Sequence, residues 1–288
     1  MTTNPAICIT VLAYNEEGRI ATCLKSLPLN DDNVEIHVVV NGSSDSTAKI
    51  ARQIAGGASN VMVHEYAEGG KARSWNRFIF GDLPQVHDAH VFVDGDAEVL
   101  PGSINALAST LANSPEANAA SGLPMNGRKA EHYREMIRRD HGIFGDLYAL
   151  SGEFVRRMRA GGIKLPEDVV GDDGLICAMA KTDLADESNW LDARVAVCED
   201  AGFLCAPVAA LDPQSWLMQY RRMVNYSVRH FQNGMITPIM RADGPAKLPT
   251  RLADLYGETL PRLRPRSHPQ LYWFDRAALR RMRRAISA

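Results

Sequence analysis

The chain has 288 residues, 45% of them hydrophobic and 23% charged, and its formal net charge at pH 7 is -2. This composition is typical of a folded globular protein, so it excludes a disordered, collagen-like or coiled-coil chain, and the near-neutral charge argues against a general nucleic-acid binder. No apolar run approaches the roughly 18 residues of a transmembrane helix, and the first residues lack the basic start of a secretory signal, so we expect a cytoplasmic protein.

The first hundred residues alternate short apolar runs with longer amphipathic segments, which is typical of βαβ units around a mostly parallel sheet. Asp45 or Ser46 can cap the second of the amphipathic segments. Beyond about residue 115 the alternation loosens, with helical stretches and isolated strands. Strands are expected at residues 7–12, 35–40, 61–65, 90–93 and 193–197, and helices at residues 17–27, 45–54, 71–80, 102–113 and 175–180.

The last 48 residues differ in composition, with 11 Lys and Arg against 4 Asp and Glu, and five prolines. Leu279, Met282 and Ile286 recur at spacings of three and four among arginines, which predicts a short basic amphipathic helix. This helix can pack Trp273 and Leu279 on the rest of the protein or on the second subunit of a homodimer. It can also dock peripherally at the anionic inner face of a membrane. Packing is the commoner use, and we expect it here.

Five cysteines without a C-x-x-C pair are expected to be reduced thiols in the core, because a chain of this length needs no disulfide staples.

Polar residues follow the expected strands at the sheet edge where open parallel sheets bind ligands. The first two turns, A-Y-N-E-E at 13–17 and N-G-S-S-D at 41–45, match neither G-x-G-x-x-G nor the P-loop, which argues against a dinucleotide-binding dehydrogenase and a P-loop NTPase. After the fourth strand comes D-G-D at 94–96, the only D-x-D in the chain. Its carboxylates suit Mg²⁺ or Mn²⁺, which could neutralise a diphosphate. The plainer alternative is a solvated acidic turn.

Taken together and in order, these motifs resemble those of family 2 glycosyltransferases over about residues 5–230. The set comprises A-Y-N-E-E at 13–17, N-G-S-S-D-S-T at 41–47, G-K-A-R at 70–73 with Asn76, V-D-G-D at 93–96, G-D-D-G at 171–174 and Q-x-x-R at 219–222. The resemblance implies a GT-A fold, an α/β architecture with a Rossmann-like, mostly parallel sheet flanked by helices. It also implies a nucleotide-sugar donor, a divalent metal at the D-x-D and, usually, inversion at the anomeric carbon.

The resemblance also implies roles for individual residues. Of the adjacent carboxylates Asp172 and Asp173, the second matches the family's catalytic base, which must come within hydrogen-bond reach of the acceptor hydroxyl. Asp168 is a rival base, and His230 is a weaker candidate for the metal shell. The implied binding residues are Tyr14, Glu16, Asn41, Lys71 and Arg73 for the nucleotide, Asp94 and Asp96 for the Mn²⁺ or Mg²⁺ ion, and Gln219 and Arg222 for the diphosphate or the acceptor.

Several positions depart from the family pattern. Leu12 stands where many members have proline, Val40 and Asn41 stand where many have a pair of aspartates, and Asp172 stands where the acceptor pair usually has glutamate. Asn41 stands where many members have an aspartate that takes part in uracil recognition. Its amide can still hydrogen-bond a base edge, so UDP is the expected nucleotide. Met223 stands where the family's Q-x-x-R-W ending has tryptophan.

We therefore expect a metal-dependent glycosyltransferase domain over residues 1–240, with a nucleotide half to residue 98 and an acceptor half from residue 99. A proline-broken helical extension would follow over residues 241–288. The acceptor can be a small molecule, a lipid-linked compound or a glycan. A nucleotidyltransferase is a rival, although the chain lacks the basic, glycine-rich loop expected after its first strand. The departures above also keep open a non-catalytic sugar-nucleotide-binding module, which measurable donor hydrolysis would exclude.

Overall fold

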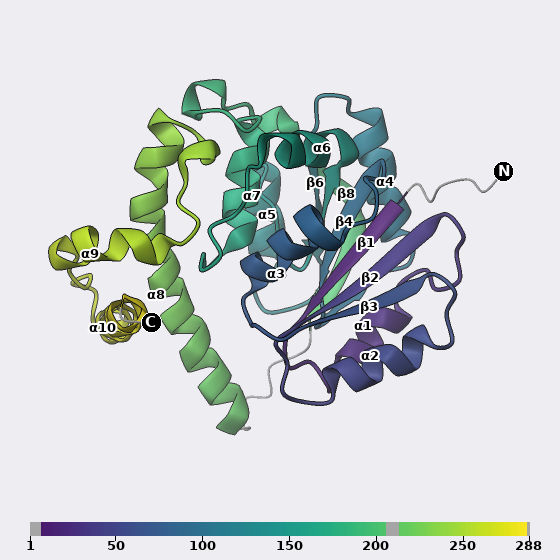
Figure 1. Ribbon diagram of the computed structural model, residues 1–288, viewed down its shortest axis with the longest axis horizontal. Coiled ribbons are helices and arrows are strands. Elements are labelled where there is room, and N and C mark those ends of the chain that lie inside the picture. The colour runs from purple at the N-terminus through teal and green to yellow at the C-terminus, as the bar shows by residue number, and fades with distance from the viewer. Residues whose placement is uncertain (1–6, 206–212, 287–288) are drawn as a thin grey trace.

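The computed structural model describes residues 7–205 and 213–286. In these ranges the chain forms an eight-stranded sheet of order β3-β2-β1-β4-β7-β6-β8-β5, with helices on both faces (Figure 1). The strands are β1 Ile7–Ala13, β2 Val34–Asn41, β3 Val61–Tyr66, β4 Ala89–Asp94, β5 Ala97–Val99, β6 Ala119–Pro124, β7 Leu147–Ser151 and β8 Val195–Cys205. The α-helices are α1 Ile20–Lys25, α2 Thr47–Ala55, α3 Lys71–Arg77, α4 Ser103–Asn113, α5 Ala130–Asp140, α6 Gly152–Gly161, α7 Asp172–Lys181, α8 Pro213–Ala242, α9 Tyr256–Thr259 and α10 Pro269–Ala285.

Strand β1 lies at the centre of the nucleotide half and is buried along its whole length. Its side chains alternate between two cores. Ile9 and Val11 pack in the core that includes α1, α2 and α4, whereas Cys8 and Leu12 pack in the core that includes α3, α6 and α7. Both neighbours, β2 and β4, are parallel to it. A strand covered on both faces reads as a continuous apolar run, and the first four predicted strands are confirmed as β1 to β4.

The predicted helices are present with shifted ends. Helix α1 begins at Ile20, later than predicted. Glu17 lies in the loop before it, where its carboxylate accepts a hydrogen bond from the Ser46 backbone N–H (3.0 Å). Helix α2 begins at Thr47, whose backbone N–H donates to Asp45 Oδ1 (3.0 Å). Asp45 rather than Ser46 therefore supplies the side-chain cap.

The second half of the sheet is mixed. Strand β7 is antiparallel to both β4 and β6, while β6 and β8 are parallel. The predicted strand at residues 193–197 is the first part of the longer β8. This half brings the loop before β7 beside the end of β4, where the backbone N–H of Asp94 donates to the Asp146 carbonyl (3.2 Å).

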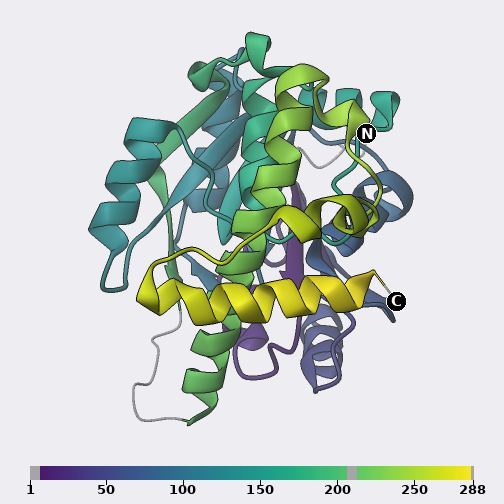
Figure 2. The ribbon, with the colours of Figure 1, turned by 90° about the vertical axis from the view of Figure 1, so that its left-hand side faces the viewer.

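The C-terminal segment packs on α8, and Figure 2 shows α10 crossing that long helix. Leu279 and Met282 are buried, which confirms the predicted amphipathic helix, whereas Trp273 is 64% exposed. Trp273 contacts Tyr272 and Arg276 of its own helix, so the predicted packing of its ring on the catalytic domain is wrong. No helix in the described ranges is both long and apolar enough to span a bilayer. All five cysteines are free, as predicted. Four are buried in the core, whereas Cys205 is half-buried.

Candidate functional site

The loops after β1 and β2 bind each other at the carboxyl edge of the sheet. The backbone N–H of Asn15 donates to Ser43 Oγ (3.0 Å), and that of Glu16 donates to Thr47 Oγ1 (2.7 Å). These bonds fix the loop that carries Tyr14, whose side chain is 56% exposed at the mouth of the site.

Three carboxylates gather where β4 ends. Asp94, Asp96 and Asp146 each offer an oxygen, and these oxygens lie within 4.8 Å of one another. Gly95 permits the turn between the first two, because a Cβ at this position would lie 2.7 Å from the Ala13 Cβ. The predicted metal-binding pair is thus joined by Asp146, which the sequence analysis missed. Among the described residues the cluster contains no histidine, so the weaker candidate His230 is not part of it.

Burial and mutual repulsion raise the pKa values of two carboxyl groups in this cluster. Burial, and then repulsion from Asp96, raise the pKa of Asp146. Burial also raises the pKa of Asp94, as does repulsion from Asp146, and the Lys71 ammonium opposes both effects. Glu16 is affected in the same way, since burial and Asp96 raise its pKa to about 7. Such a site favours a cation or protons.

Lys71 links the acidic cluster to the start of α7. Its Nζ lies 2.7 Å from Asp94 Oδ1 and 3.7 Å from Asp172 Oδ2. Asp172 is 6% exposed, and among the described residues its Oδ2 has no hydrogen-bond partner. These two carboxylates raise the pKa of Lys71 despite its burial, so the side chain stays charged at neutral pH. Lys71 therefore supplies the positive charge between the two aspartates.

Asp173, the predicted base, lies on the first turn of α7 beside Arg229 of α8. Its Oδ1 is 3.3 Å from Arg229 Nη1, and its side chain is 23% exposed. The rival base, Asp168, instead holds a neighbouring turn of backbone. Its two carboxylate oxygens accept hydrogen bonds from the N–H groups of Leu252 and Ala253 (2.6 and 2.9 Å). Because both oxygens are engaged there, Asp168 is a poor candidate for proton transfer.

The Asn41 side chain faces inward more than the sequence suggested. It is 5% exposed, and its Oδ1 accepts hydrogen bonds from the Gly70 N–H (2.7 Å) and the Ser74 hydroxyl (2.9 Å). Both lone pairs of this carbonyl are thereby used, which leaves the amide N–H₂ as the group able to contact a base.

Two further predicted residues, Arg73 and Arg222, are held by neighbours, and a third, Gln219, lies on the same helix as Arg222. Arg73 Nε lies 3.1 Å from a carboxylate oxygen of Glu167. Arg222 Nε donates to the Tyr226 hydroxyl (2.9 Å), and its charge partly opposes the rise in the pKa of Asp146. Gln219 is half-buried on α8, one turn before Arg222.

Two adjoining cavities, of about 250 and 600 Å³, open at this edge of the sheet. Tyr14, Asn41 and Lys71 line both of them. The smaller cavity also contains Glu16, Asp94 and Asp96, and the larger one also contains Arg73, Asp168 and Asp172. Most of the predicted site residues therefore surround one continuous space.

Comparison with known proteins agrees with this geometry. The model of the family described as "Glycosyl transferase family 2" matches residues 8–179. A 4,4'-diaponeurosporenoate glycosyltransferase of Staphylococcus haemolyticus is 32% identical over 97 residues, which are 34% of this chain and 26% of that protein. The chain thus matches about a quarter of the length of this relative.

Solved structures share the fold. A mannosyltransferase of Pyrobaculum calidifontis in complex with GDP-Man and Mn²⁺ superposes with a TM-score of 0.61 at 22% identity, over 99% of this chain and 76% of that one. Glucosyl-3-phosphoglycerate synthase of Mycobacterium tuberculosis, in complex with Mn²⁺, UDP and phosphoglyceric acid, superposes with a TM-score of 0.53 at 20% identity, over 78% of each chain.

Proposed function

The chain belongs to glycosyl transferase family 2, and on this basis we propose that it transfers a sugar from a nucleoside-diphosphate donor, most simply a UDP-sugar, to an acceptor hydroxyl with inversion. The observation that carries the proposal is that Asp94, Asp96 and Asp146 gather at the end of β4, where Lys71 joins them to Asp172 and lines both adjoining cavities.

The three aspartates fit a divalent cation. They offer oxygen ligands only, which suit Mn²⁺ and Mg²⁺, and their separation allows one ion to contact all three. Each aspartate has one oxygen with a partner: Lys71 contacts Asp94 Oδ1, Arg19 contacts Asp96 Oδ2 and Cys205 contacts Asp146 Oδ2. The other oxygen of each aspartate is the proposed ligand. A bound ion would supply Lewis-acid stabilisation of the leaving diphosphate. The two solved structures above hold Mn²⁺ together with a nucleotide or a nucleotide sugar.

Asp173 is proposed as the base of a single displacement. As the acceptor oxygen forms its bond to the anomeric carbon, the bond from that carbon to the diphosphate breaks and the acceptor proton moves to the carboxylate. Arg229 contacts Oδ1, so Oδ2 is the atom proposed to receive the proton. Lys71 holds its charge beside Asp94 and Asp172 and is proposed to orient the donor.

Recognition of the base is proposed to use the Asn41 amide as a donor. Its Oδ1 is already engaged, so Asn41 can donate to a carbonyl oxygen of uracil but is not free to accept the uracil N3–H. A screen of UDP-, GDP- and CDP-sugars by thermal shift with Mn²⁺ tests this preference. A ligand at 100 times its dissociation constant adds about 2.7 kcal/mol of stability, which is enough to register.

The chain's position in the cell and its partners are also proposals. We propose a cytoplasmic enzyme whose residues 241–288 stabilise the catalytic domain by packing rather than anchor it to a lipid surface. Ala278, Leu279 and Met282 of α10 are buried, as is Asp275, which is bound by Arg266 at 2.7 Å. The exposed arginines of α10 leave peripheral membrane contact as the competing proposal.

The decisive test compares Asp173→Asn with Asp200→Asn, an exposed carboxylate outside the cavities. Loss of the base should lower turnover by about 10²- to 10⁴-fold, while donor binding barely changes and the control keeps full activity. Wild-type turnover in Asp173→Asn would reject this base. A product with retained anomeric configuration, seen by NMR, would reject the single displacement.

A further inference from the structure

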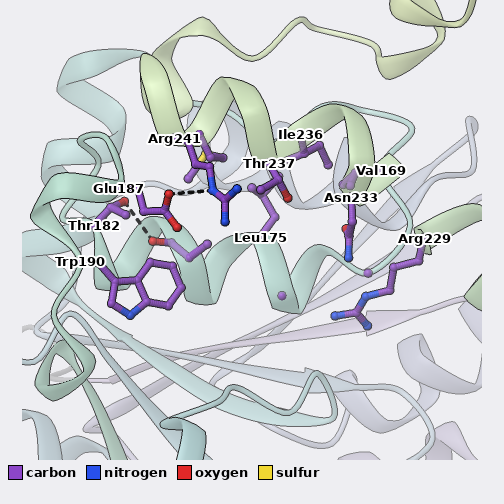
Figure 3. Close-up of a pocket in the computed structure, with 14 residues that line it drawn as sticks. Val169, Leu175, Thr182, Glu187, Trp190, Arg229, Asn233, Ile236, Thr237 and Arg241 are labelled. Carbon is purple, nitrogen blue, oxygen red and sulfur yellow. Dashed lines mark hydrogen bonds and ion pairs between the residues drawn. The ribbon is translucent and has the colours of Figure 1, made fainter. Parts of the chain in front are cut away.

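A separate cavity lies between α7 and α8, outside the donor space described above. It has a volume of about 260 Å³ and adjoins the larger donor cavity, with which it shares Val169 and Gly171 (Figure 3). Small-molecule sites in proteins usually occupy about 300–1,000 Å³, so this space can hold a ring-sized part of a ligand rather than a whole substrate.

One end of the cavity is formed by the arginine that contacts the proposed base. Arg229 lines it and also contacts Asp173. The two glycines on either side of the aspartate pair make room for this guanidinium: a Cβ on Gly171 would lie 2.5 Å from Arg229 Nε, and one on Gly174 would lie 2.4 Å from Arg229 Nη2. A ligand in the cavity would therefore contact Arg229, and Arg229 in turn contacts Asp173 at the start of α7.

The opposite end carries an aromatic wall that is held in place. Trp190 is 45% exposed and lines the cavity. Its Nε1 donates to Asp192 (3.0 Å), and the Lys181 Nζ lies 4.9 Å from the centre of its ring. Between the two ends the lining is mainly apolar, with Leu175, Ala178, Ile236 and Met240. Such a pocket suits a flat or ring-shaped apolar surface.

The charged residues of the lining are all paired. Arg241 Nε lies 2.7 Å from Glu187 Oε2, and Arg229 is paired with Asp173. Within the part of the chain that the structure describes, the lining thus offers no unpaired cation to a phosphate or carboxylate group. Asn233 and Thr237, which also line the cavity, remain as uncharged hydrogen-bonding groups. This composition favours a neutral ligand over an anionic one.

We infer that the cavity between α7 and α8 binds the apolar ring of a neutral acceptor whose hydroxyl reaches Asp173. The inference rests on the proposed glycosyl transfer and adds the chemical class of the acceptor, which is uncharged and has an apolar ring-sized part next to its hydroxyls. A phosphorylated acceptor does not fit this lining, because the charged residues of the lining are already paired.

The test uses the full chain with UDP and Mn²⁺, and phenyl β-D-glucopyranoside as a neutral probe, measured by calorimetric titration. Trp190→Ala and Ala178→Leu, which remove the aromatic wall and fill the floor, should each weaken probe binding about tenfold. Trp273→Ala removes another exposed indole, on α10, and should bind the probe as the wild type does.

Equal affinities in the wild type and in both cavity variants would overturn the inference. So would tighter binding of glucose 6-phosphate than of the neutral probe. Hydrolysis of the donor without acceptor, measured on the same proteins, reports the proposed function separately. If donor hydrolysis is absent and the probe still binds in a Trp190-dependent way, the proposed function fails and the assignment of the cavity to a neutral ring holds.

Discussion

His90 should make the protein markedly less stable in mild acid. It lies on β4 with no exposed surface, and its Nε2 accepts a hydrogen bond from the His87 backbone N–H (3.1 Å). Burial lowers its pKa to about 3, and the nearby positive or titratable groups His87, Arg156, Arg159 and His37 act in the same direction. The folded protein therefore holds His90 neutral where the unfolded chain protonates it.

The sign and size of the effect follow from proton linkage. Below the unfolded pKa of 6.5 the unfolded chain binds more protons, so the free energy of unfolding falls as the pH falls from 6.5 toward 3. Each pH unit in this window costs about 1.4 kcal/mol, and a fall from pH 7.5 to 5.0 costs about 2 kcal/mol through His90 alone.

Urea unfolding at pH 7.5 and 5.0 measures this cost in the wild type and in His90→Gln, whose side-chain oxygen can still accept the His87 N–H. The wild type should lose about 2 kcal/mol more than the variant between the two pH values. Other buried histidines remain in both proteins, so the difference reports His90. His132→Gln, at an exposed position of α5, should behave as the wild type. An equal loss in the wild type and His90→Gln would refute the reasoning.

Three further outcomes are expected. Asp96→Ala should abolish transfer and leave the unfolding midpoint unchanged within experimental error, since a loop carboxylate supplies coordination rather than packing. Excess EDTA should reproduce the loss of transfer, and full activity in EDTA would remove the metal from the mechanism. Asp146→Asn should weaken Mn²⁺ binding in a calorimetric titration while UDP binding without metal is kept, and an unchanged Mn²⁺ affinity would exclude the third ligand. Truncation after Ser267 should lower solubility or change the oligomeric mass, because it uncovers the apolar face of α8 that α10 buries. A truncated protein that stays soluble and active, and that merely stops sedimenting with anionic vesicles, would support membrane docking instead.

The parts of the fold that the sequence predicts well are those with a strong local signal. Strands β1, β2 and β4 of the nucleotide half are short apolar runs buried almost throughout, whereas the edge strand β3 is partly exposed, and the D-x-D follows β4 directly. Strand β7 is also a short buried apolar run, but it is not among the predicted strands, and nothing in its sequence specifies an antiparallel neighbour. Its pairing with β4 joins residues more than 50 positions apart, and it decides where Asp146 lies. Periodicity along the chain contains no information about such a contact.

Arg229, which contacts the proposed catalytic base, was not predicted for a related reason. The Q-x-x-R spacing drew attention to Arg222, which binds Tyr226, whereas Arg229, two turns further along α8, contacts Asp173. Both arginines lie on α8 near the site. Only the rotation of α8 and its distance from α7 decide which of the two contacts Asp173. The one local hint was the pair of glycines around the aspartates, whose missing side chains leave space for a guanidinium.

The position of Asp146 makes the acidic cluster a property of the assembled sheet rather than of either half. Residues up to 98 carry Asp94 and Asp96, and the third carboxylate arrives only with the loop before β7. A protein split between the two halves would therefore bring two of the proposed ligands on one fragment and the third on the other. Ion capture of the proposed kind would then favour reassociation of the fragments, because a ligand that binds only the joined state stabilises it by mass action.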